Sequence, residues 1–352
     1  MSTSTPTSQS TCPSPNQPLS TMGPADELLD PRRRDLIARL SRFMENPETD
    51  SIGWACLWFA DLSTMEDLIK ACEQNPPTVS RHISAALKKN DQRAQAIRAW
   101  ASARSSEDSG EPSADKESDT EEPPTKKRRL TSDPCRAKEL CEERDDEKCV
   151  LTGFTVPVEV VHIIPRSLGK GEEGLSDFWE ALECYWSSEK VSAWKEQVLD
   201  PDGVETCSNL MCLVNVARRL WELAVFALKP LSLSEDKRQL EVQFYWLPMN
   251  RYQQTMPVTA IPSPFPHNLS STNAEYTTVL CNIVTDSTIR SGDIFTFKTD
   301  DPVGHPLPSM QLLNMQWILT RVLALSGAAW VTEEEPFPDR DNEIEVEEEE
   351  DQ

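Results

Sequence analysis

Three separate places in this chain carry residues that together could hydrolyse a phosphodiester bond. With a single metal ion, that reaction needs a base to deprotonate water, a divalent ion to offset charge on the phosphate, and groups that fix both. His162, at the end of a predicted strand, is a candidate base, and Asn209 is a candidate orienting group. The helix expected to begin near Asn215 is the place for a metal ligand.

Each of these side chains also has an ordinary structural interpretation. A histidine at the end of an apolar strand is often a hydrogen-bonded core residue. An asparagine that follows a serine, as Asn209 follows Ser208, is a common turn former. The spacing of these residues alone is therefore weak evidence for chemistry, and the sequence around each of them has to decide.

Short strands and helices are predicted around the candidate residues. β-Branched residues bounded by Gly or Pro predict strands at 149–153 and 158–165, and residues 205–213 are typical of a turn that leads into a strand. The other predicted elements are helices at 178–186, 216–223 and 308–325 and strands at 226–228 and 240–247. The helix at 308–325 is apolar nearly all round, so we expect it to be buried against the core.

Several fragments around these points form one pattern. They are His162-Ile163-Ile164-Pro165, Glu205-Thr206-Cys207 with Asn209-Leu210, Ala217 through Trp221, Phe226 through Pro230, and Val242-Gln243-Phe244 with Trp246-Leu247. Together they resemble the HNH nuclease domain as it occurs in many fungal proteins. The resemblance is close over residues 144–250 and extends more loosely to Ala329.

The resemblance implies an α+β fold with a ββα-metal core, a divalent metal such as Mg²⁺ in an active member, and DNA as substrate. His162 then matches the general base and Asn209 the central asparagine. The metal-binding histidine of the helix is expected directly after Ala217, where this sequence has Arg218. A guanidinium has no lone pair to offer a cation, so Arg218 cannot be a ligand. Val161, where many HNH enzymes have an acidic ligand, cannot bind a metal either.

Other residues are candidate substitutes for the missing ligand. Asn215 comes just before the helix, and Glu222 lies four residues after Arg218 on the same helix face. Glu222 could reach a metal only if Arg218 turned away, and a stabilising Arg218–Glu222 pair is the simpler prediction. His267 and His305 each stand beside proline in a predicted loop, where lone histidines are usually structural or surface residues.

Two functions fit this pattern. The first is a metal-dependent DNA endonuclease, impaired because Arg218 replaces the metal-binding histidine. The second is a catalytically silent module that binds DNA or protein without a cofactor, with Arg218 and Arg219 as phosphate contacts or as plain solvated surface. Activity that needs added metal and disappears in His162→Ala favours the enzyme. Affinity that falls with salt and ignores a chelator favours the binding module.

Most of the negative charge lies outside the predicted core. The net charge is −24, of which residues 333–352 supply −11 and residues 105–125 supply −7, leaving −6 elsewhere. This remainder permits a local basic face for nucleic acid but does not supply one. The ten cysteines are irregularly spaced and include no CxxC pair, so we expect reduced thiols rather than disulfides or a zinc knuckle.

Composition divides the chain into five predicted segments. They are a disordered start at 1–25, a helical region at 26–103, an acidic linker with a basic cluster at 104–134, an HNH nuclease-like domain at 135–330 and a disordered acidic tail at 331–352. Within the helical region, apolar spacing predicts helices over 31–45, 65–72 and 79–87. This region and the acidic tail are the candidate contacts for protein partners.

The expected location follows from the apolar and basic runs. No stretch approaches the ~20 apolar residues that span a bilayer, and the first 25 residues have no secretory signal, so an intracellular protein without membrane contact is expected. The basic cluster at 126–129 is either a nuclear import signal or a solvated charge run.

Overall fold

The computed structural model describes residues 23–44, 46–74, 92–106, 134–169, 172–199, 203–248, 250–271 and 278–330. The predictions for both ends of the chain, for a helix over 79–87, for most of the acidic linker and for the basic cluster lie outside the described residues. The predicted domain boundaries stay predictions.

Four helices and a 3₁₀ turn lie in the first part of the described chain, and they confirm the helices expected near 31–45 and 65–72. Asp30 caps the first helix by accepting a 2.8 Å hydrogen bond from the backbone N–H of Arg32. Asp50 caps the second helix through the N–H of Gly53, also at 2.8 Å. The elements are η1 (Asp26–Leu29), α1 (Pro31–Ser41), α2 (Ser51–Phe59), α3 (Leu62–Gln74) and α5 (Gln92–Ser106).

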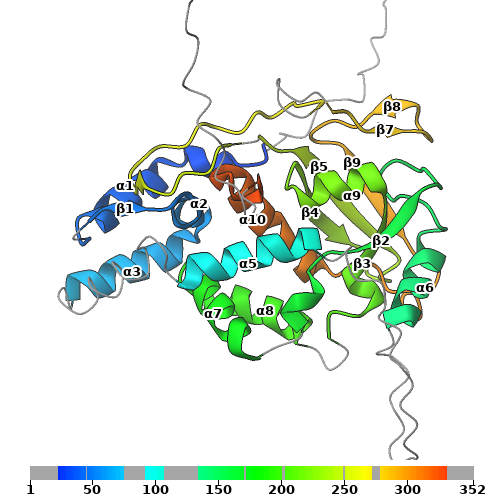
Figure 1. Ribbon diagram of the computed structural model, residues 1–352, viewed down its shortest axis with the longest axis horizontal. Coiled ribbons are helices and arrows are strands. Elements are labelled where there is room, and N and C mark those ends of the chain that lie inside the picture. The colour runs from blue at the N-terminus through cyan, green and yellow to red at the C-terminus, as the bar shows by residue number, and fades with distance from the viewer. Residues whose placement is uncertain are drawn as a thin grey trace, which may run out of the picture.

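The buried helix predicted at 308–325 is confirmed as α10 (Met310–Ser326). In Figure 1 it runs through the middle of the molecule, and it contacts both α2 and the strand β4 (Phe226–Leu233). Gly327 ends the helix at a φ of 74°, and a Cβ there would lie 2.3 Å from the backbone nitrogen of Tyr252, so only glycine fits. Buried residues from Ala25 to Ala328 form one large cluster, which the early helices and the later strands therefore share.

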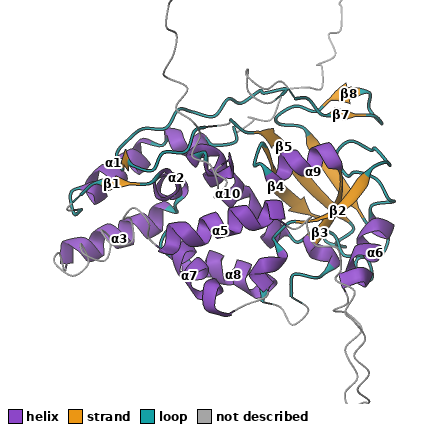
Figure 2. Ribbon diagram, viewed as in Figure 1, coloured by secondary structure: helices purple, strands orange, loops and turns teal. Residues whose placement is uncertain are grey.

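Small antiparallel sheets complete the fold (Figure 2). The three-stranded sheet has the order β4-β5-β9, with Phe226 opposite Trp246, and it confirms the strands predicted at 226–228 and 240–247. Phe226 stacks on Phe244 at 4.8 Å between ring centroids, which ties the first two strands together. The remaining strands are β5 (Gln239–Trp246), β9 (Ile294–Lys298), β1 (Glu48–Thr49) with β6 (Met256–Pro257), β2 (Val158–His162) with β3 (Leu210–Val214), and β7 (Cys281–Asn282) with β8 (Ser287–Thr288).

The strand predicted at 149–153 is wrong, because this segment is a turn. The N–H of Gly153 donates to the carbonyl of Cys149 at 2.9 Å, and the N–H of Cys149 donates to the carbonyl of Phe154 at 2.8 Å. Gly153 has a φ of 75°, which an extended strand does not contain. Leu151 and Thr152 are buried within the turn. Burial within a turn, and not strand pairing, therefore accounts for these residues.

Helices α7 and α8 account for the aromatic segment that follows. The helix predicted at 178–186 is confirmed but begins and ends earlier, as α7. The elements are α6 (Pro134–Arg144), η2 (Arg166–Gly169), α7 (Glu172–Glu183), α8 (Ser188–Val198), η3 (Cys207–Asn209) and η4 (Ala328–Trp330). Mixed helices and antiparallel sheets confirm the α+β class. Within the described residues, no helix has the length and apolar character needed to cross a bilayer.

Candidate functional site

The strands and helix predicted around His162 form a ββα unit. Strand β2 (Val158–His162) pairs antiparallel with β3 (Leu210–Val214), and helix α9 (Asn215–Glu222) follows β3 directly. His162 lies opposite Leu210, at the end of β2. The turn η3 leads into β3 and carries Asn209. The unit therefore brings His162, Asn209 and Arg218 from three separate segments into one region, as the sequence predicts.

His162 is nearly buried and contacts a carboxylate. Its side chain is 6% exposed, and its Nε2 lies 3.3 Å from Oε2 of Glu205. The other carboxylate oxygen of Glu205 accepts a hydrogen bond from Nε of Arg166. Burial alone would raise the pKa of Glu205, but His162 and Arg166 outweigh it and leave the pKa below its ordinary value. A charged Glu205 thus fixes the imidazole between β2 and the turn before η3.

Asn209 is fully buried and holds the backbone beside His162. Its Oδ1 accepts from the N–H of Ile164 at 2.9 Å, and its Nδ2 donates to the carbonyls of Ile164 at 2.8 Å and Val204 at 2.9 Å. The backbone carbonyl of Asn209 also accepts from the N–H of Ile163 at 2.8 Å. The side chain thus connects the two segments that flank the site, and it orients His162 through the backbone that follows it.

Replacing Asn209 by alanine is expected to reduce the free energy of unfolding by about 2–3 kcal/mol, because it leaves buried backbone groups of Ile164 and Val204 without partners. Urea denaturation measures this loss. Asn215→Ala is the matched control, since Asn215 is exposed and, among the residues that the structure describes, its side chain bonds to the neighbouring N–H of Val216 alone. We expect a change within about 0.5 kcal/mol there. Equal effects of the two variants would contradict this role of Asn209.

Arg218 occupies the position of the expected metal ligand and is held by two carboxylates. Its Nε donates to Oε1 of Glu222 at 2.8 Å, and its Nη1 donates to Oε2 of Glu159. Burial lowers the pKa of Arg218, but the hydrogen bonds that it donates to Glu222 and Glu159 outweigh burial and raise the pKa above its ordinary value. The predicted Arg218–Glu222 contact is therefore present, and the guanidinium does not turn away from the site.

Sequence reasoning missed Glu159. Residues two apart in a strand face the same side, so Glu159 shares its face of β2 with Val161, the position where an acidic residue was sought. A carboxylate is thus present on the expected face of the strand, but two residues earlier than expected. Its partner across the unit is the guanidinium of Arg218.

A small pocket of about 80 Å³ opens beside His162. Its lining carries cationic side chains from three helical segments and from a 3₁₀ turn, namely Arg104, Lys138, Arg166 and Arg218, together with Glu222. Arg104 comes from the end of α5, at the first position of the predicted acidic linker. Its Nη2 donates to the carbonyl of Trp221, whereas its buried Nη1 has no hydrogen-bond partner among the described residues.

Arg104 is a buried charge without adequate compensation. Burial lowers its pKa to about 9, and Glu222 opposes this only in part. The guanidinium therefore remains charged at neutral pH. An oxyanion beside this guanidinium would supply the missing charge, and one that reached the buried Nη1 would also supply the missing hydrogen bond.

The side chains around His162 do not fit a divalent metal. Arg218 has no lone pair to give, and the two carboxylates nearest to it are engaged by its guanidinium. Asn215 is exposed and turned to its own helix. His267 and His305 are paired elsewhere, with Asp26 at 3.2 Å and with Glu143 at 2.9 Å, and neither lines the pocket.

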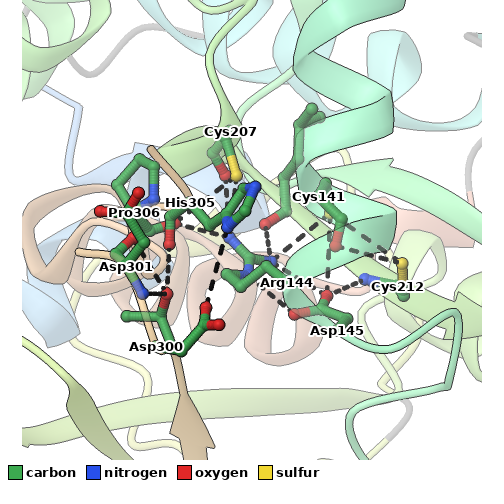
Figure 3. A network of polar contacts seen from close by, with 11 residues as sticks. Cys141, Arg144, Asp145, Cys207, Cys212, Asp300, Asp301, His305 and Pro306 are labelled. Atoms are coloured by element: carbon green, nitrogen blue, oxygen red, sulfur yellow. Dashed lines mark hydrogen bonds and ion pairs between the residues drawn. The ribbon is translucent and has the colours of Figure 1, made fainter. Parts of the chain in front are cut away.

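The sulfur atoms of Cys141 and Cys212 lie 4.0 Å apart near Asp145, and these three form the one group in the described chain with metal-ligand spacing. Figure 3 shows that Arg144 fills the space beside them. Its Nε and Nη2 donate to both carboxylate oxygens of Asp145, at 2.7 and 2.9 Å. The contact with Cys212 and burial raise the pKa of Cys141 well above its ordinary value, so the thiol stays protonated. These groups hold a guanidinium and not a metal ion.

Comparison with known proteins agrees with the geometry. Residues 149–229 match the family model described as HNH endonuclease. No curated protein and no solved structure matches the chain. The matched range contains β2, β3 and α9, with His162, Asn209 and Arg218. The family model and the ββα unit therefore support an HNH nuclease domain in this part of the chain.

Proposed function

We propose that this chain is a catalytically silent HNH protein of the fungal type that binds nucleic-acid phosphate in the pocket beside His162. The observation that carries the proposal is the pair of ion pairs made by Arg218. Glu159 and Glu222 hold its guanidinium at the position where the family's metal-binding histidine is expected. A fixed cation at that position neutralises the carboxylates that a metal would need. The ancestral activity, metal-dependent cleavage of DNA, is then impaired while phosphate recognition remains.

The pocket offers donors that suit a phosphodiester. Arg104 presents an orphan Nη1, and Lys138 is exposed on α6 with no carboxylate of the described residues within 4.0 Å of its Nζ. Arginine and lysine beside a concave site are the usual contacts to a nucleic-acid backbone. The charge of the rest of the chain opposes such binding, so we expect modest affinity with a strong dependence on salt.

An endonuclease is the second candidate, and the His162–Glu205 contact favours it. A carboxylate that holds an imidazole is the arrangement that orients a general base. Two further proposals do not involve this pocket. One is that the helical region or the acidic tail binds a protein partner, and the other is a nuclear location.

A fluorescent DNA oligonucleotide titrated with the full chain tests the binding proposal. We expect affinity that falls steeply with added salt and is unchanged by EDTA. Lys138→Met should weaken binding about fivefold, because one phosphate contact is lost. For the same reason, the slope of log affinity against log salt concentration should become shallower by about one. Arg136→Met removes the same charge from the same helix, but Arg136 pairs with Glu139 at 3.0 Å outside the pocket and should have little effect.

Two results would argue against the proposal. Equal loss of affinity in Lys138→Met and Arg136→Met would mean that the pocket does not contact the DNA. Loss of binding on addition of EDTA would mean that a metal ion carries the interaction, and the endonuclease would become the better candidate.

A further inference from the structure

A second cationic pocket, of about 450 Å³, lies where α1, α8, α10 and the α2–α3 junction meet. It is separate from the His162 pocket and shares no lining residue with it. The charged side chains that line it are Glu27, Arg33, Asp61, Lys190 and Arg321. Three cations therefore face two carboxylates, which leaves one unit of positive charge without compensation.

Arg33 is a buried cation without an ion pair. It is 5% exposed, and no carboxylate of the described residues lies within 4.0 Å of its nitrogens. Its Nε donates to the carbonyl of Glu27 at 3.2 Å and its Nη1 to the carbonyl of Ala60 at 2.5 Å. Burial lowers the pKa of Arg33 despite Glu27, Asp30 and Asp61, and Arg321 lowers it further. A buried charge of this kind is costly unless an anion joins it.

Arg321 lies beside Arg33 and is held rigidly. Its guanidinium carbon lies 4.2 Å from the ring centroid of Trp317 and 4.6 Å from that of Phe59. Its Nη1 donates to the carbonyl of Pro24 at 3.1 Å and to the carboxylate of Glu27. For Arg33 and Arg321 alike, the Nη2 nitrogen has no hydrogen-bond partner among the described residues, although Nε and Nη1 do.

We propose that this pocket, lined by Arg33, Arg321 and Lys190, binds a tetrahedral oxyanion, either inorganic phosphate or a phosphomonoester. The two Nη2 groups and the Nζ of Lys190 supply donors from α1, α10 and α8, which suits an acceptor with several oxygens. Lys190 already contacts Asp61 at 2.5 Å and Arg321 contacts Glu27, so the oxyanion compensates chiefly the charge of Arg33. Occupancy would connect the first helix of the described chain to the central helix α10.

Thermal unfolding of the full chain in increasing inorganic phosphate, at ionic strength held constant with NaCl, tests the proposal. A ligand that binds only the folded state raises the unfolding midpoint in a saturable way. Arg33→Lys keeps the charge but loses the planar fork, and we expect its phosphate affinity to fall about tenfold or more. Arg39→Lys is the matched control, because Arg39 lies on the same helix outside the pocket, its side chain is 40% exposed, and it pairs with Glu73 at 3.0 Å.

Two further variants protect the test against misfolding and against phosphate in the other pocket. Ser63 is exposed at the rim, so Ser63→Asp puts a carboxylate there without disturbing the core. Ser63→Asp should raise the unfolding midpoint in the absence of phosphate and abolish the further increase that phosphate causes. Lys138→Met alters only the His162 pocket and should keep the increment.

The measured midpoints distinguish a phosphate site from a general salt effect. The proposal is wrong if phosphate raises the unfolding midpoint no more than NaCl does. It is also wrong if phosphate raises the midpoint of both Arg33→Lys and Ser63→Asp as much as it raises that of the native chain. Phosphoserine is the second ligand. If it stabilises the chain at lower concentration than inorganic phosphate, the oxyanion is an ester group. The reverse order identifies free phosphate, and either order supports the pocket.

Discussion

Arg218→His is expected to nick plasmid DNA in the presence of Mn²⁺ at least about 100-fold faster than the native chain, the order of magnitude that charge stabilisation at a reacting phosphate supplies. The substitution removes the cation that Glu159 and Glu222 now hold. It leaves an imidazole and two carboxylates on β2 and α9. The residues at 218 and 222 are four apart and so lie on one helix face, a spacing suited to a shared metal ion.

The same change should create a measurable metal site. Calorimetric titration with Mn²⁺ is expected to detect one site in Arg218→His and none of comparable affinity in the native chain. Arg219→His is the matched control, because Arg219 is exposed and its one ion pair within the described part of the chain is with Glu222, at 3.1 Å. It should gain neither metal binding nor nicking. Adding His162→Ala to Arg218→His should abolish the activity if His162 is the base.

A native chain that nicks DNA with Mn²⁺, and stops when His162 is replaced by alanine, would contradict this account. Other groups would then hold the metal, and the enzyme would be intact. A silent Arg218→His variant that binds Mn²⁺ normally would instead show that the ligand was not the only function lost from the domain.

The parts of this site that depend on short-range sequence patterns could be predicted from the sequence. The strand before His162, the turn before β3 and the helix with Arg218 were predicted from short-range patterns, because β-branched runs and helical spacing are local properties. Asn209 was identified through the resemblance. The structure adds what it does, since three side-chain hydrogen bonds hold the backbone on both sides of the site.

Residues brought in by tertiary contacts could not be found in this way. Arg104 lies more than fifty positions before His162 in sequence, and nothing in the pattern of α5 distinguishes it from a surface arginine. Its contact with the carbonyl of Trp221 becomes visible only when α5 packs against the ββα unit. Glu205 was within a recognised fragment, yet its role depends on the distance to His162, which sequence spacing does not give.

The segment 149–153 shows the opposite error. Its local pattern predicts a strand, but in the folded chain it forms a turn. Buried apolar residues occur in strands and in tight turns alike, and the left-handed φ of Gly153 decides between them. Cys141 and Cys207 are buried and contact Arg144, whereas Cys135 is exposed. These contacts are tertiary, so sequence spacing does not give them.

Arg144→Met is expected to lower the free energy of unfolding by about 3–5 kcal/mol, the cost of breaking a buried ion pair on one side. The Arg144 side chain is fully buried, and all five of its N–H donors have partners. Besides the two bonds to Asp145, they reach the carbonyls of Cys207 at 3.0 Å, Pro306 at 2.9 Å and Leu210 at 2.8 Å. The arginine thus joins α6, η3, β3 and the loop before α10.

Urea denaturation of Arg144→Met beside Arg136→Met measures this contribution, because Arg136 lies on the same helix but is half exposed. The control should lose less than about 1 kcal/mol. The double variant Arg144→Met with Asp145→Asn should recover part of the loss, since it no longer leaves an unpaired carboxylate in the core. An equal loss in the double variant would mean that the carbonyl contacts of Arg144, and not its charge pair, hold the ββα unit to α6.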